Sequence, residues 1–187
     1  MRILIAALSF ALILGSARAE SEVDPSLKIV VIRHAEKPLS GENLNCQGEN
    51  RARHIPAMLE KKFGRIERIY VPSFASRDGK TLHSRMFQTA TPTAIRFGLE
   101  INSQFTSAEP DKVAQSLRLQ KGTILVIWNH SAIPRLMNSL GFTIQAWKDA
   151  DFDSILVIDF RSGSANMTME AQEIFPSQEC IGLGADK

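Results

Sequence analysis

Cysteine, tyrosine and tryptophan are scarce in this chain of 187 residues, which holds 2 Cys, 1 Tyr and 2 Trp. Two cysteines far apart exclude a cysteine-ligated zinc site, and the 4 histidines include no pair at metal-ligand spacing. Glycine-rich phosphate loops and the G-x-S-x-G elbow are absent. A cysteine phosphatase would need an arginine six residues after Cys46, where the chain has Ala52. We therefore expect neither a metal nor a cofactor.

An excess of basic charge is also missing once the first residues are set aside. Arg2, an uncharged apolar stretch and Ala17-Arg18-Ala19 have the layout of a secretory signal peptide with an A-x-A cleavage site. The apolar stretch is shorter than the ~20 residues of a membrane-spanning helix. We expect residues 1–19 to be cleaved and residues 20–187 to form one domain. Cleavage removes two of the 22 basic side chains and leaves 20 against 20 acidic ones.

A mature chain of this kind has no basic face for nucleic acid. Its leader predicts a periplasmic or secreted protein without stable membrane insertion. Because an exported chain meets an oxidising compartment, Cys46 and Cys180 could form a disulfide, and two separate thiols are the alternative.

Short apolar runs alternate with helical patterns from residue 28 onward. Pro56 lies inside the first helical pattern, so that helix should start late or bend there. The alternation predicts an α/β fold, a three-layer α/β/α sandwich around a mostly parallel sheet. The expected strands are 28–33, 68–71, 99–101, 123–128, 154–160 and 166–175, and the expected helices are 47–63, 84–97, 110–120 and 131–140.

Two histidines directly follow apolar strands. Arg33-His34-Ala35-Glu36 comes after the first strand, and His130 comes after the apolar run 124–128. In open α/β sheets ligands bind at the carboxyl ends of the strands, so both histidines could face one pocket. The segment Ser84-Arg85-Met86-Phe87-Gln88-Thr89-Ala90 adds a third basic element at the start of a helix.

At these residues the chain resembles the histidine phosphatase superfamily, which includes phosphoglycerate mutases and histidine acid phosphatases. The superfamily has an R-H-G motif after its first strand, an R-x-x-Q-T-A helix start and a later histidine. All three recur here in order, with Ala35 in place of the glycine. The chain looks most like small exported bacterial members with an R-H-x-E-K-P signature. The resemblance implies a phosphoglycerate mutase-like fold and a metal-independent phosphatase.

The resemblance also implies roles for individual residues. His34 becomes the nucleophile that is transiently phosphorylated, and Arg33, Arg85 and His130 form the phosphate pocket. Lys37 is a weaker phosphate contact. Arginine suits a phosphate pocket because its planar guanidinium group can donate two parallel hydrogen bonds to phosphate oxygens. Neighbouring guanidinium charges should also lower the pKa of His34 and keep the imidazole neutral for attack.

The general acid that protonates the leaving group is harder to identify. The acid-phosphatase branch has an aspartate directly after the second histidine, where this chain has Ser131. Glu109 is the preferred candidate; Glu100 and Asp111 are alternatives, and a dedicated acid could also be absent. Glu36 fits an orienting hydrogen-bond partner better than a proton donor.

The leading hypothesis is an exported phosphatase that hydrolyses phosphomonoesters or related small phosphorylated compounds through a phosphohistidine. The alternative is a catalytically silent relative that binds a phosphorylated ligand or a partner protein in the same pocket. The sequence contains no code for the substrate.

Overall fold

A computed structural model describes residues 23–77, 80–161 and 164–180 of the chain. The expected leader, residues 1–19, lies outside these ranges. Within them, no helix is long and apolar enough to cross a membrane.

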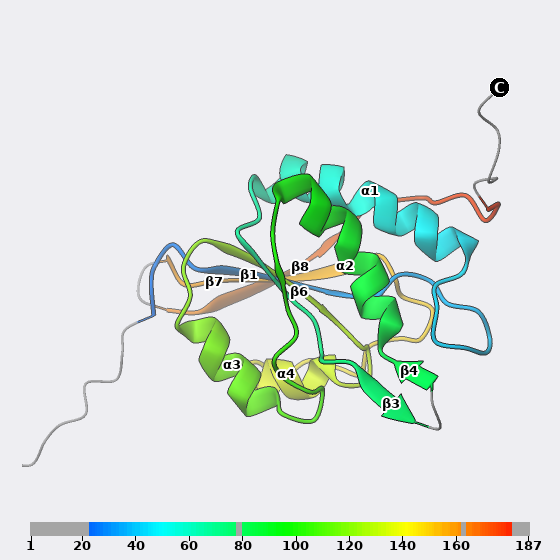
Figure 1. Ribbon diagram of the computed structural model, residues 1–187. Helices are drawn as coiled ribbons and strands as arrows, with labels where there is room; N and C mark the ends of the chain where they lie inside the picture. The colour runs from blue at the N-terminus through cyan, green and yellow to red at the C-terminus, as the bar shows by residue number, and fades with distance from the viewer. Residues whose placement is uncertain (1–22, 78–79, 162–163, 181–187) are drawn as a thin grey trace, which may run out of the picture.

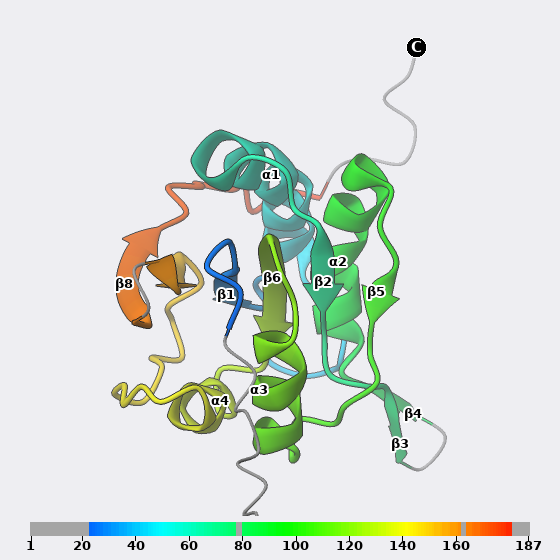
Figure 2. The ribbon, with the colours of Figure 1, turned by 90° about the vertical axis from the view of Figure 1, so that its left-hand side faces the viewer.

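A six-stranded sheet in the order β5-β2-β6-β1-β7-β8 forms the centre of the molecule (Figures 1 and 2). The four strands from β5 to β1 are parallel, while β7 runs antiparallel to β1 and β8 antiparallel to β7. The predicted mostly parallel sheet is therefore confirmed. Its strands are β1 Lys28–Arg33, β2 Arg68–Tyr70, β5 Ile101–Asn102, β6 Thr123–Trp128, β7 Ser154–Asp159 and β8 Asn166–Ala171.

Helices cover both faces of the sheet, as Figure 1 shows: α1 Cys46–Phe63 and α2 Ser84–Phe97 lie on one face, and α3 Pro110–Arg118 and α4 Ile133–Ser139 lie on the other. Alternate residues of β1 point to opposite faces: Val30 and Ile32 pack with the helices α1 and α2, whereas Ile29 and Val31 pack with α3 and α4. A strand buried on both sides reads as a continuous apolar run, which is why β1 and β6 stand out in the sequence.

Three local expectations need correction. Helix α1 begins at Cys46 and continues through Pro56, so the expected late start is wrong; Asn45 caps it by accepting from the Gly48 amide at 2.8 Å. A hairpin of β3 Ala75–Arg77 and β4 Lys80–Leu82 forms in a segment where neither a strand nor a helix was expected. So short a hairpin leaves no apolar periodicity to detect.

The last strand is shorter than expected, because β8 ends at Ala171 instead of continuing to residue 175. Its continuation turns toward Asp153: the Gln172 amide donates to the Asp153 carbonyl at 2.7 Å, and the amides of Glu173 and Ile174 reach the Asp153 carboxylate at 3.3 and 3.4 Å. The first bond keeps the register of the β7–β8 pair, whereas the other two go to a side chain and not to the backbone of the neighbouring strand.

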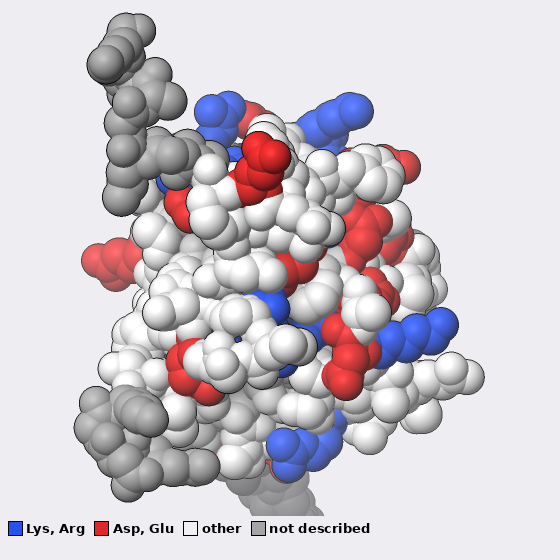
Figure 3. Space-filling model, turned by 90° about the vertical axis from the view of Figure 1, so that its right-hand side faces the viewer, with Lys and Arg blue, Asp and Glu red and all other residues white. Residues whose placement is uncertain are grey.

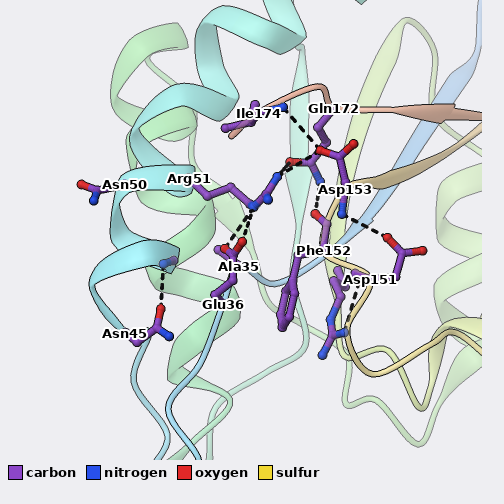
Figure 4. A network of polar contacts seen from close by, with 12 residues as sticks. Ala35, Glu36, Asn45, Asn50, Arg51, Asp151, Phe152, Asp153, Gln172 and Ile174 are labelled. Atoms are coloured by element: carbon purple, nitrogen blue, oxygen red, sulfur yellow. Dashed lines mark hydrogen bonds and ion pairs between the residues drawn. The ribbon is translucent and has the colours of Figure 1, made fainter. Parts of the chain in front are cut away.

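A buried ion cluster joins α1 to the ends of the central strands (Figure 4). Arg51 Nε lies 2.9 and 3.0 Å from the two carboxylate oxygens of Glu36, and Arg51 Nη1 lies 3.2 Å from both Asp153 and Gln172 side-chain oxygens. The Gln172 amide group also donates to the Phe152 carbonyl at 2.8 Å. The cluster therefore fixes the segment after β1 and the segment before β7 relative to the same helix.

Replacing Arg51 with Met should destabilise the protein by about 3–5 kcal/mol, because Glu36 would stay buried without its counter-charge. The side chains of Arg51 and Glu36 are only 7% and 8% exposed. Urea unfolding measures the loss. The double variant Glu36→Gln/Arg51→Met should recover part of it, and an additive double variant would contradict the paired burial.

Cys46 and Cys180 form a disulfide, the alternative that the sequence could not distinguish from two separate thiols. Cys46 is the first residue of α1, and the bond spans 134 residues of the chain. The same helix also holds the C-terminal segment through Asn50, whose side-chain amide donates to the carbonyls of Ser177 and Glu179 at 2.9 Å each.

Removing the bridge with Cys46→Ala/Cys180→Ala should lower the free energy of unfolding by up to about 4 to 5 kcal/mol, since the unfolded chain regains the freedom of a long loop. Urea unfolding with and without a reductant is the measurement. The reductant should shift the midpoint of the native protein and leave that of the double variant unchanged; a shift in both would point to another cause.

Candidate functional site: a histidine pair on a buried guanidinium

The site lies where β1 and β6 end. The two strands are parallel neighbours with Arg33 opposite Trp128, and the His34 amide donates to the Trp128 carbonyl at 3.1 Å. After these strands the chain turns to opposite faces, to α1 from β1 and to α4 from β6. Such a divergence opens a crevice at the carboxyl edge of the sheet. Figure 3 shows this side of the molecule, with Lys and Arg side chains at the bottom of a hollow and Asp and Glu side chains around it.

Arg33 forms the buried centre of the site and is 1% exposed. Its Nη1 donates to three backbone carbonyls of the segment before β7: those of Lys148 at 3.2 Å, Asp149 at 2.7 Å and Asp151 at 3.2 Å. The guanidinium carbon also lies 3.9 Å from the centre of the Phe152 ring, a cation–π contact. Burial lowers the pKa of Arg33 to about 10, and nearby Asp149 and Asp151 oppose the shift. Arg33 is thus a cation at neutral pH.

His34 follows Arg33 and is 2% exposed. Its Nδ1 lies 2.7 Å from the Ala35 carbonyl oxygen. A carbonyl can only accept, so Nδ1 must hold the proton, and Nε2 has the lone pair of the neutral ring. Burial lowers the pKa of His34 to about 3, with smaller contributions from Arg33, Arg85 and His130. The expected neutral imidazole is supported, although burial rather than guanidinium charge is the main cause.

His130 is connected to His34 through Arg33. Arg33 Nη2 lies 3.3 Å from His130 Nδ1, and a guanidinium can only donate, so Nδ1 accepts and the proton of the neutral ring is on Nε2. That Nε2 lies 2.8 Å from the carboxylate oxygen Oδ1 of Asp149. Burial and the charge of Arg33 lower the pKa of His130, while Asp149 opposes them. The two histidines therefore have opposite tautomers: His34 can attack through Nε2, and His130 can donate through Nε2.

Arg85 is brought to the same region by the first turn of α2. Its Nη1 donates to the Gly41 carbonyl at 2.6 Å, and its Nη2 lies 3.5 Å from the Glu42 carboxylate. One turn later, the Thr89 hydroxyl accepts from the Ala35 amide at 3.0 Å and donates to the Arg85 carbonyl at 2.8 Å. Helix α2 is thus bound to the loop that follows His34. Among the described residues, the Nε atoms of both site arginines are buried and have no hydrogen-bond partner.

Lys37 and Glu36 follow His34 in the chain but lie in different surroundings. Lys37 is exposed, and its charge contributes to the lowered pKa of His130, so it lies near the site. Glu36 is directed into the buried cluster with Arg51, as Figure 4 shows. Lys37 as a phosphate contact stays a prediction.

Glu109 is engaged at the start of α3. Its carboxylate accepts from the Thr106 amide at 3.0 Å and from the Thr106 hydroxyl at 2.9 Å, and it pairs with Lys112 at 2.6 Å. These contacts, Lys112 first, lower the pKa of Glu109 to about 2. Both carboxylate oxygens of Glu109 are thus occupied, one by Thr106 and the other by Lys112. The structure therefore gives Glu109 a structural role, and its assignment as the acid stays a prediction.

No sequence motif marks the segment before β7, which supplies the carbonyls, the ring and the carboxylate around Arg33 and His130. Its only signal is the acidic and aromatic run Asp149-Ala150-Asp151-Phe152-Asp153 directly before a strand. Nothing in that pattern shows that it folds over the end of β1. Among the described residues, no group of three or more potential metal ligands occurs.

The depressed pKa of His34 makes stability depend on pH in a defined window. The unfolded chain binds a proton with a pKa near 6.5 and the folded chain only near 3. Stability from His34 should be complete above pH 6.5 and should fall as the pH drops toward 3. Urea midpoints between these limits should fall more steeply for the native protein than for His34→Gln; parallel curves would contradict a neutral buried His34.

No protein-family model matches the sequence, and no curated protein matches it. Solved structures do match. The protein histidine phosphatase SixA complexed with tungstate is 16% identical, with a TM-score of 0.54 over 78% of this chain and 97% of the SixA chain. The candidate phosphohistidine phosphatase SixA from Agrobacterium tumefaciens is 13% identical, with a TM-score of 0.49 over 78% of this chain and 97% of that one.

A phosphoglycerate mutase from Plasmodium falciparum is 12% identical, with a TM-score of 0.40 over 77% of this chain and 98% of that one. At such identities the likeness concerns the fold. The chain therefore has the α/β/α fold of the SixA phosphatase, as the sequence predicted.

Proposed function

We propose that this protein is a member of the histidine phosphatase superfamily that hydrolyses small phosphorylated compounds through a phosphohistidine on His34. The supporting observation is the neutral, buried His34 with its lone pair on Nε2, beside the cation of Arg33. A neutral imidazole next to fixed cations suits attack on an anionic phosphoryl group. The structures with the same fold include a protein histidine phosphatase with bound tungstate, an oxyanion.

In the first step, His34 Nε2 forms a bond to phosphorus while the bond to the leaving oxygen breaks. Charge on the phosphoryl oxygens is met by Arg33, Arg85 and the Nε2–H of His130. In the second step, water attacks phosphorus, the P–N bond breaks and its electron pair returns to His34. Inorganic phosphate then leaves. The chemistry uses no metal and no cofactor.

The cellular location belongs to the same proposal. The leader predicted at residues 1–19 and the disulfide between Cys46 and Cys180 both fit an oxidising, exported environment. We therefore propose a periplasmic or secreted enzyme that acts on small phosphorylated substrates.

The test is turnover of 4-nitrophenyl phosphate by the mature protein, with and without His34→Ala. The native protein should release phosphate, and the variant should be slower by on the order of 10³-fold or more because it lacks the nucleophile. His54→Ala is the matched control, since His54 is exposed on α1. Acid-labile phosphate should be trapped on the native protein during turnover.

Equal rates for the native protein and His34→Ala would overturn the mechanism. A native protein that binds tungstate in a His34-dependent way but turns over no phosphomonoester would establish the silent binding protein instead.

A further inference from the structure

We propose that Asp149 is the general acid of this site, the group that protonates the oxygen of the leaving group. The inference rests on the proposed function and names a catalytic residue that the sequence motifs do not contain.

Asp149 is held at the site by both its backbone and its side chain. Its carbonyl accepts from Arg33 Nη1 at 2.7 Å, the shortest of the three carbonyl contacts of that guanidinium. Its carboxylate oxygen Oδ1 lies 2.8 Å from His130 Nε2. The position of Asp149 is therefore set by the same two residues that are proposed to bind the phosphoryl group.

The side of the pocket on which Asp149 lies suits a proton donor. In-line attack places the leaving group opposite the nucleophile, and His34 is 2% exposed at the bottom of the site. The leaving group must therefore point toward solvent. The side chain of Asp149 is 92% exposed while it contacts His130. It thus stands at the outer edge of the pocket, where the departing oxygen emerges and where water can exchange protons with the carboxyl group.

The other carboxylates near the site are committed elsewhere. Both Glu36 oxygens accept from Arg51, and Asp151 accepts from the Ser154 hydroxyl at 2.6 Å and from two backbone amides. Glu42 pairs with Arg85, and Glu109 with Lys112. Within the described part of the chain, the Asp149 carboxylate is paired with His130 Nε2–H, the donor that a bound phosphoryl oxygen would take over. Binding of the substrate would thus release the carboxyl group next to the reacting bond.

The proton balance closes over the cycle. Protonated Asp149 gives its proton to the bridging oxygen as the P–O bond breaks and the bond from His34 to phosphorus forms. The resulting carboxylate takes a proton from the attacking water while the P–N bond breaks. Phosphate and the alcohol are released, and Asp149 and His34 return to their starting states.

The test compares native protein and Asp149→Asn on two substrates, 4-nitrophenyl phosphate and ethyl phosphate. The amide keeps the shape but cannot give up a proton. Ethyl phosphate, with a basic leaving oxygen, should be hydrolysed about 10²–10⁴-fold more slowly by the variant, and 4-nitrophenyl phosphate within about threefold of the native rate. Tungstate should bind both proteins alike. Asp24→Asn, at the opposite end of β1, should leave both rates unchanged.

Equal slowing of both substrates by Asp149→Asn would remove Asp149 from the role of acid. Unchanged rates on both substrates for Asp149→Asn would also remove Asp149 from this role. So would a loss confined to ethyl phosphate in Glu109→Gln or Glu42→Gln. In each of these cases the proposed function would still stand. A native protein inactive on both substrates would refute the proposed function, and this inference with it.

Discussion

The burial of one guanidinium group at the end of the central strand is the constraint on which the rest of the site depends. Arg33 is 1% exposed, and a charge buried to that degree needs polar partners to offset the loss of hydration. Backbone carbonyls from the segment before β7, the Phe152 ring and the His130 ring supply them. Because a guanidinium can only donate, its contact with His130 also decides which nitrogen of that ring holds the proton. One buried charge therefore positions the segment before β7, fixes the tautomer of His130 and contributes to the electrostatic potential at His34.

This arrangement needs support from a second layer, which the Arg51 cluster provides. Arg51 connects Glu36, just after His34, with Asp153, just after Phe152. The two segments that meet at Arg33 are thus attached to the same side chain of α1. The disulfide attaches the C-terminal segment to the first turn of this helix. Cross-links to one helix therefore hold both segments that surround Arg33, and such support helps to keep the groups of a site in position.

The features that the sequence predicted correctly are those that depend on residues close together in the chain. The apolar runs of β1 and β6 and the periodicity of the helices are local, and they gave the fold class and most elements. One departure occurs where a segment distant in sequence competes for the backbone: β8 ends early as the Asp153 carboxylate accepts from the amides of Glu173 and Ile174. Another, the hairpin β3–β4, is local but has no apolar pattern. The neutral state of His34 was expected from nearby arginines, but burial by the surrounding fold is the larger cause.

The order of residues along the chain is enough to place Arg33, His34 and His130 after strands and Arg85 at the start of a helix, because each position depends on neighbours in the chain. Which carboxylates lie near the two histidines depends on contacts that form only in the folded protein. Glu109, chosen from its place in the chain, is paired with Lys112, whereas Asp149 reaches His130 from a segment with no motif. The tautomers of the two histidines were decided in the same way. The reason is physical: a proton's position is set by the donors and acceptors within hydrogen-bond reach, and folding brings these together from segments far apart in sequence.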